Sequence, residues 1–213
     1  MLRYENKSFK DYGFTWRKDT IVKFMKGILI GSAIFLLIII ILLLFTDLSI
    51  AQRNKPWDPF SAFWYFSIIP LALMEEIAFR SYSFIKLNKI FGLRITQLIV
   101  AIAFALYHII QGWDFQVAFL GPAIWAFVFG LAAIWSKGIA MPTGIHVALN
   151  LIQQVLGMKG GDTGSIWELK HKTTASAESI SQTDTIGIII QLFVLVSAIL
   201  FTEYYLRKTK HSH

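Results

Sequence analysis

The feature that most constrains this chain is the long apolar run from Ile21 to Phe45, with GILIGSAIFLLIIIILLLF at its centre. A helix that spans a lipid bilayer needs about 20 mostly apolar residues. The run is too long for the core of a signal peptide, and no small-x-small cleavage site follows it. We therefore expect a membrane-spanning helix that remains in the protein as an anchor.

The composition agrees with a protein that lies mostly in lipid. Hydrophobic residues make up 55% of the chain and charged residues 15%, whereas a soluble domain carries about 25% charged residues. The net charge of +7 does not indicate nucleic acid as a partner, because the Lys and Arg residues cluster outside the apolar runs, where loops meet anionic headgroups. The absence of Cys excludes disulfides, thiolate zinc sites and a cysteine nucleophile.

Further apolar segments predict an all-α, polytopic helix bundle with about six transmembrane helices and an active site inside the bundle. A polar stretch at 157–184 predicts a loop outside the membrane. We expect three parts: 1–57 with the first helix and an external loop, a core at 58–156, and 157–213 with the last helix and a basic tail. After the first helix, the predicted spans are Phe60–Leu87, Ile95–Gln111, Phe115–Ser136, Gly138–Leu156 and Thr185–Leu206.

The distribution of Lys and Arg predicts the orientation. Outside the spans, fourteen of them fall on the side that holds both termini and five on the other side. By the positive-inside rule, both termini are cytoplasmic. We expect a multi-pass protein of a bacterial plasma membrane, whose buried site opens toward the cytoplasm.

Three charged residues lie within the second predicted span, in the sequence EEIAFR: Glu75, Glu76 and Arg80. A charge at the bilayer centre costs about 2.5–3.5 kcal/mol, so these side chains should face the bundle interior and have partners there. Glu76 and Arg80 are four residues apart, in the favourable order for an ion pair. Glu75 points about 100° away from Glu76 and would be left free. Alternatively, all three form one ionic cluster that fixes helix packing.

The third predicted span carries His108 in an otherwise apolar helix. Gln97, Phe104, His108 and Gln111 fall at helical spacing on one face. A single His on such a face is more often a hydrogen-bonded core residue than a functional one, so His108 alone does not indicate a site.

The fifth predicted span carries a polar stripe along one face. Pro142 and Gly144 precede its histidine and should loosen the helix there. The stripe either belongs to a site or forms interhelical hydrogen bonds. It consists of Thr143, His146, Asn150 and Gln153 or Gln154.

Depth favours a single site. At about 1.5 Å per residue, Glu75, His108, His146 and Asn150 all lie roughly 12–21 Å from the predicted inner face. A carboxylate at this depth suits a general base acting on water, a neutral His beside it suits positioning that water, and His146 with Asn150 suits donation to an oxyanion. The chain has no HExxH motif, no membrane-embedded pair of Asp residues and no GxSxG motif.

Three motifs together resemble those of a known family. EEIAFR, FALYH and HVALN match the patterns EExxxR, FxxxH and HxxxN of the CPBP family. This family comprises the CAAX proteases and bacteriocin-processing enzymes, is also called the Abi family, and includes the Ras-converting CAAX endopeptidase. The resemblance covers about Phe60–Leu156.

The resemblance implies an intramembrane endopeptidase that acts on a membrane-associated protein or peptide and contacts membrane lipids. Glu75 with His108 would activate water, and His146 with Asn150 would hold the oxyanion. The supporting residues would be Glu76, Arg80 and Phe104. Whether a metal takes part stays open: Glu75, His108 and His146 suit a His₂Glu zinc set with one open position, and members of the family have also been viewed as glutamate-dependent without a catalytic metal.

Two other classes of function are compatible with the sequence. One is a membrane immunity or regulatory protein that uses this fold as a scaffold, since some relatives are linked to bacteriocin self-immunity. The other is a proton-coupled transporter, which the lack of a visible repeat disfavours. The substrate stays open among a prenylated CAAX end, a bacteriocin leader and a signalling peptide.

Overall fold

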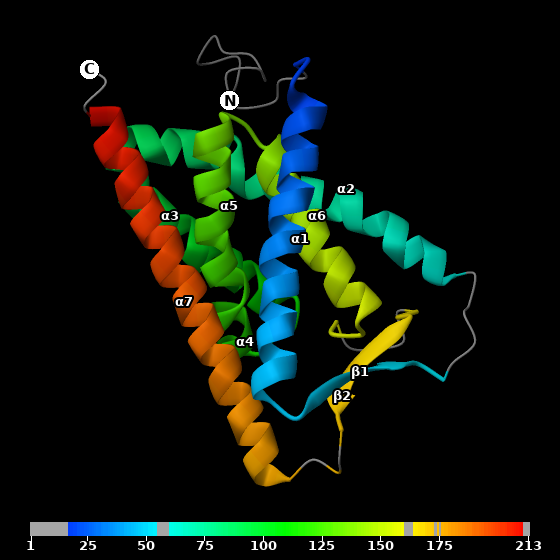
Figure 1. The fold of residues 1–213 in the computed structure, drawn as a ribbon. Coiled ribbons are helices and arrows are strands. Elements are labelled where there is room, and N and C mark those ends of the chain that lie inside the picture. The colour runs from blue at the N-terminus through cyan, green and yellow to red at the C-terminus, as the bar shows by residue number, and fades with distance from the viewer. Residues whose placement is uncertain (1–16, 55–59, 160–163, 173, 175, 211–213) are drawn as a thin grey trace.

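The computed structural model describes residues 17–54, 60–159, 164–172, 174 and 176–210. Within these ranges the chain forms helices joined by short connections, and two short strands (Figure 1). The order is α1 (Thr20–Phe45), β1 (Leu48–Gln52), α2 (Ser61–Arg80), α3 (Tyr82–Ile110), α4 (Phe115–Leu120), α5 (Pro122–Ser136), α6 (Ala140–Val155), β2 (Trp167–His171) and α7 (Ala177–Lys210).

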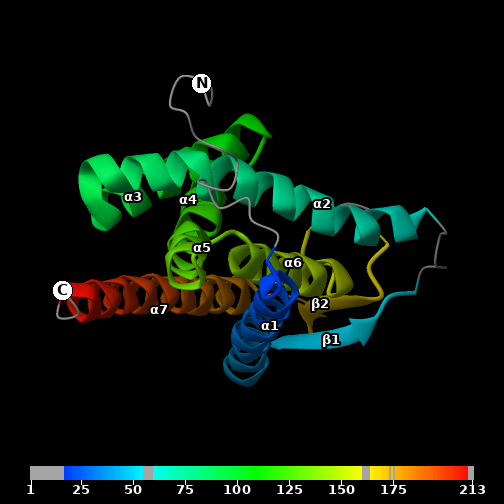
Figure 2. The ribbon, with the colours of Figure 1, turned by 90° about the horizontal axis from the view of Figure 1, so that it is seen from above.

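The helices form one bundle with α5 and α6 at its centre. Seen from above, α2 and α3 lie on one side, α1 and α7 lie on the other, and α5 and α6 run between them (Figure 2). The central position explains why α5 and α6 are buried over much of their length, whereas α1 and α7 expose many large apolar side chains. Exposed apolar faces of this kind are what lipid contacts in a membrane protein.

The prediction of a helical membrane bundle is confirmed, but the count of about six spans is not. In the described residues, four helical stretches are long and apolar enough to cross a membrane: Thr20–Phe45, Ser61–Ile110, Phe115–Ser136 and Ala177–Lys210. The predicted fifth span is the 16-residue helix α6, which is shorter than the roughly 20 residues that a full crossing requires. The predicted second and third spans follow one another almost without interruption as α2 and α3.

Two local breaks shape the α2–α3 stretch. Helix α2 ends at Arg80, because Ser81 has a non-helical backbone with φ −92° and ψ −111°. The predicted span Phe60–Leu87 is therefore too long at its end. A second break lies at Gly92, whose φ of 76° glycine adopts without steric cost. Residues 82–91 consequently form a short helix between two changes of direction.

Most basic residues of the described chain gather at one end of the bundle, which we call the basic end. Figure 1 shows that α1 begins and α7 ends there, that residues 82–91 lie along it, and that the connection between α5 and α6 lies there too. The N-terminal residues 1–16, for which a basic cytoplasmic segment was predicted, lie outside the described residues. The basic end carries Arg17, Lys18, Lys23, Lys26, Lys86, Lys89, Lys137, Arg207, Lys208 and Lys210.

Helix α6 is held against α1 through glycine. A Cβ atom added at Gly144 would lie 2.1 Å from the carbonyl oxygen of Phe24, and one added at Gly27 would lie 2.2 Å from that of Met141. Small residues let helix backbones approach this closely in membrane proteins. The expectation that Gly144 loosens the helix is therefore wrong: α6 is continuous here, and Gly144 is a packing residue.

We predict that Gly144→Ala destabilises the protein, since either the α1 or the α6 backbone must shift to admit a methyl group. Overpacking of this kind costs about 1–3 kcal/mol. Gly187→Ala is the matched control, because a Cβ atom at Gly187 in α7 meets nothing within 4 Å. The measurement is the thermal unfolding midpoint in detergent, which should fall for Gly144→Ala alone. Equal midpoints for the two variants would contradict the close packing.

A small antiparallel sheet joins the two long connections outside the helices. Strand β1 pairs with β2, with Leu48 opposite His171 and Gln52 opposite Trp167. The stretch 157–184 was predicted to be a loop, but it contributes β2 and the first turns of α7, which begins at Ala177. Short polar strands whose partner is distant in sequence give no clear pattern, so this pairing was not predictable from local sequence.

Candidate active site

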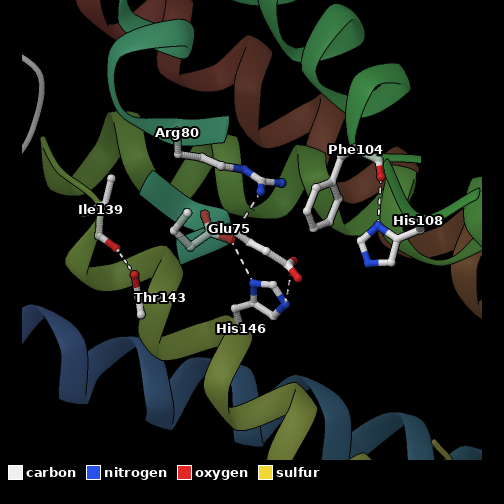
Figure 3. A network of polar contacts seen from close by, with 8 residues as sticks. Glu75, Arg80, Phe104, His108, Ile139, Thr143 and His146 are labelled. Carbon is white, nitrogen blue, oxygen red and sulfur yellow. Dashed lines mark hydrogen bonds and ion pairs between the residues drawn. The ribbon is translucent and has the colours of Figure 1, made fainter. Parts of the chain in front are cut away.

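The charged and polar residues of three helices meet inside the bundle. Helix α2 contributes Glu75, Glu76 and Arg80, helix α3 contributes His108, and helix α6 contributes His146 (Figure 3). The sequence predicted one shared site for these helices, and the structure brings these five side chains together.

The Glu76–Arg80 ion pair forms as predicted from the spacing. Arg80 Nη1 donates to Glu76 Oε1 over 3.3 Å, and neither side chain is exposed. The guanidinium carbon of Arg80 lies 4.3 Å from the centre of the Phe104 ring and 5.0 Å from that of Phe129. These ring faces stabilise a cation that has lost its water.

His146 lies between the two carboxylates of α2, which the sequence did not predict. Its Nδ1 donates to Glu76 Oε1 over 2.9 Å, and its Nε2 lies 3.7 Å from Glu75 Oε2. The imidazole also stacks on Phe129, with ring centres 4.7 Å apart and an interplanar angle of 17°. Glu76 thus fixes the tautomer and the orientation of His146, and Nε2 remains directed at Glu75.

His108 faces the same group of residues from α3. Its Nδ1 donates to the carbonyl oxygen of Phe104 over 2.8 Å, which leaves Nε2 as the acceptor nitrogen of the neutral ring. Figure 3 shows its ring across from the Glu75 carboxylate. His108 lies in the last turn of α3.

Several buried polar atoms of the site have no hydrogen-bond partner within the described part of the chain. They belong to both glutamates and the arginine: Glu75 Oε2, Glu76 Oε2, Arg80 Nε and Arg80 Nη2. A buried polar atom left unpaired costs about 1–3 kcal/mol, and such atoms in native proteins commonly bind water or a ligand. Since the side chain of Glu75 is 19% exposed and that of Glu76 is not exposed at all, Glu75 is the carboxylate that solvent or substrate reaches.

Asn150 lies one turn beyond His146 on α6 and is half-buried. Within the described residues its side chain makes no hydrogen bond, and its role as an oxyanion donor beside His146 stays a prediction. Thr143, from the same polar stripe, donates to the carbonyl oxygen of Ile139 in its own helix (Figure 3). Thr143 is thus satisfied by the backbone of α6.

Gln97 serves packing between helices and lies outside the site. Its Nε2 donates to the carbonyl oxygen of Phe127 in α5 over 3.4 Å, and its Oε1 accepts from Thr202 of α7 over 3.2 Å. Gln97 therefore forms hydrogen bonds between helices, as polar residues often do in membrane bundles. Gln111 lies just after the end of α3 and is exposed.

Two aromatic residues of the site were missed by sequence reasoning. Phe129 lies against both Arg80 and His146, and Trp113 makes an edge-to-face contact with His108 at 5.0 Å. Phe129 is one apolar residue in an apolar helix, and Trp113 lies in a connection, so neither had a signal in the sequence.

The donor set for a metal has the right chemistry but not the right arrangement. Two imidazole Nε2 atoms and the Glu75 carboxylate are zinc-type ligands, and the Phe104 carbonyl and Glu76 orient the two rings as outer partners do at metal sites. However, the described residues contain no group of three or more His, Asp or Glu side chains placed to hold a metal ion.

Comparison with known proteins gives a match to a family model. Residues 56–152 match the family model described as type II CAAX prenyl endopeptidase, Rce1-like. The matched segment contains all three motifs and runs from just before α2 to near the end of α6. It confirms the resemblance that the motifs indicated. No curated protein and no solved structure matches the chain.

Proposed function

We propose that this protein, which its residues 56–152 place in the Rce1-like CAAX protease family, is an intramembrane endopeptidase that uses water activated by Glu75 and His108. The family indicates a protease that acts on membrane-associated peptides. The observation that carries the mechanism is the Glu75 carboxylate, partly exposed, lacking a hydrogen bond at Oε2, and facing two histidine rings.

In the first step, a water molecule lies between the Glu75 carboxylate and His108 Nε2. Because Nδ1 donates to the carbonyl oxygen of Phe104, Nε2 is the acceptor nitrogen of the neutral ring, and His108 accepts a hydrogen bond from this water and orients its oxygen. Glu75 takes the other proton as the oxygen attacks the peptide carbonyl carbon. One C–O bond forms, and the carbonyl π electrons move to the oxygen.

In the second step, the oxyanion is stabilised and the amine leaves. The proton that Glu75 has taken from water moves to His146 Nε2, 3.7 Å from Glu75 Oε2, and Nε2 then donates to the oxyanion while Glu76 stabilises the positive ring through Nδ1. The Asn150 amide is the second donor. Collapse of the intermediate breaks the C–N bond, and the proton taken from water passes from His146 to the departing nitrogen. Arg80 holds the Glu76 side chain in place.

Asn150→Ala should lower kcat about 10²–10³-fold with little change in KM, because removing one oxyanion donor costs about that much. An amide suits donation better than zinc ligation. Thr143→Val is the matched control, since Thr143 lies on the same stripe and bonds only its own helix. Full kcat in Asn150→Ala, or a metal bound by wild type and lost from the variant, would assign Asn150 to packing or coordination instead.

The remaining assignments follow from this function. We propose that 58–156 is the catalytic core, that the protein lies in a bacterial plasma membrane with both termini cytoplasmic, and that lipids and a membrane-associated protein or peptide are its partners. The polar atoms buried without a partner around the half-buried Glu75 carboxylate are costly in a membrane protein. A catalytic site needs such atoms to bind water and substrate, whereas a scaffold for bacteriocin immunity does not.

The experiment that tests this function uses the purified protein in detergent. Peptides with and without a prenyl group, and bacteriocin-leader peptides, are incubated with wild type and with Glu75→Ala, and the metal content of both samples is measured. Cleavage by wild type alone supports the proposal and identifies the substrate class. A panel left intact by well-folded wild type favours the scaffold.

A further inference from the structure

The site is closed toward the basic end of the bundle. Helix α2 runs toward that end, and Arg80 lies one turn beyond Glu76 in that direction (Figure 1). Arg80 is 2% exposed, and Phe104 and Phe129 pack on its guanidinium group. A substrate arriving from the basic end would have to displace this buried ion pair and its aromatic rings.

Two observations place the approach to the site at the opposite end. First, His108 lies in the last turn of α3, and its ring contacts Trp113 in the connection that follows. Trp113 is 45% exposed. The imidazole that orients the attacking water is thus one aromatic ring away from the surface at that end.

The second observation is electrostatic. Lys159 follows the end of α6 that lies away from the basic end (Figure 1). Desolvation of its ammonium group lowers the pKa of Lys159, and the carboxylate of Glu75 acts in the raising direction. This influence on the pKa agrees with a site that lies nearer to the end of α6 followed by Lys159 than to the basic end.

The two ends also differ in charge. The basic end carries most of the Lys and Arg residues of the described chain. The opposite end has few basic residues, and it also carries the acidic residues Asp47, Asp114 and Glu168. The positive-inside rule assigns the basic end to the cytoplasm.

We propose that water and substrate reach Glu75 and His108 from the extracytoplasmic face of the membrane. The substrate class is then a membrane-anchored peptide whose scissile bond is presented outside the cytoplasm, such as a segment being exported. This inference rests on the proposed function, and it reverses the cytoplasmic access expected from the sequence.

The test compares right-side-out and inverted membrane vesicles that contain the full-length protein. The probe is a quenched fluorescent peptide, cleaved by the protein in detergent, with a charged dye that prevents it from crossing the bilayer. We expect right-side-out vesicles to cleave it at least tenfold faster than inverted vesicles, with the difference lost when detergent is added. Faster cleavage by inverted vesicles overturns the inference and leaves the proposed function intact.

If no peptide is cleaved even in detergent, the proposed function fails, and labelling decides the access side independently. Because the chain has no Cys, His108→Cys provides a single thiol in the site, and a charged, impermeant thiol reagent should modify it in right-side-out vesicles only. If His108→Cys does not fold, Lys137→Cys at the basic end and Lys159→Cys at the opposite end show on which side of the membrane each end lies. Modification of His108→Cys or Lys159→Cys from the inverted side, or of both loop thiols from one side, overturns the inference.

Discussion

Glu75→Gln should lose proteolysis almost completely while the protein folds and melts as wild type does. Glutamine keeps the size of the side chain but cannot take a proton from water, and a positioned general base contributes about 10²–10⁴ in rate. The side chain makes no hydrogen bond at Oε2 that the fold depends on. The measurement is kcat on the cleaved peptide, together with the unfolding midpoint in detergent.

Glu76→Gln is the matched control for that experiment. Glu76 binds both Arg80 and His146 and is fully buried, so the same substitution there should lower the unfolding midpoint as well as activity. Equal kcat in Glu75→Gln and wild type would remove Glu75 from the mechanism. A larger loss of stability in Glu75→Gln than in Glu76→Gln would exchange the roles of the two carboxylates.

Arg80→Met should have the largest effect on stability. It leaves Glu76 as a buried carboxylate with His146 as its remaining partner, and breaking a buried ion pair from one side costs about 3–5 kcal/mol. The aromatic contacts to Phe104 and Phe129 are lost too. The measurement is the free energy of unfolding in mixed micelles.

Arg94→Met provides the comparison. Arg94 makes a bidentate ion pair with Glu203 at 2.5 and 2.6 Å, yet its side chain is 67% exposed. Exposed pairs contribute little, so Arg94→Met should leave stability nearly unchanged. The double variant Glu76→Gln with Arg80→Met should regain part of the loss seen for Arg80→Met, because no buried charge is stranded. Equal losses for Arg80→Met and Arg94→Met would contradict a structural role for the buried pair.

Local spacing made part of this site predictable. The pair of Glu76 with Arg80 follows from four residues of helix, and the cost of charge in lipid required that Glu75, His108 and His146 find a common interior. The long apolar runs predicted a helical membrane protein in the same way, since the apolar length of a span does not depend on its neighbours.

Relations between helices were not predictable. His146 contacts Glu76 because of how α6 is rotated against α2, and no spacing within either helix contains that rotation. The packing of Gly144 against α1 was not predictable either. A glycine that loosens a helix and a glycine that lets two helices pack closely look the same in the sequence.

The central claim is that the chain hydrolyses a peptide bond with water activated at Glu75. The most direct measurement is mass spectrometry of peptide products formed in ¹⁸O-labelled water by purified wild type and Glu75→Gln reconstituted in lipid nanodiscs. The account predicts one labelled oxygen in the new carboxyl group with wild type and no product with Glu75→Gln. Labelled product in equal amount from both proteins, or no product from folded wild type on any membrane-associated peptide, would contradict it.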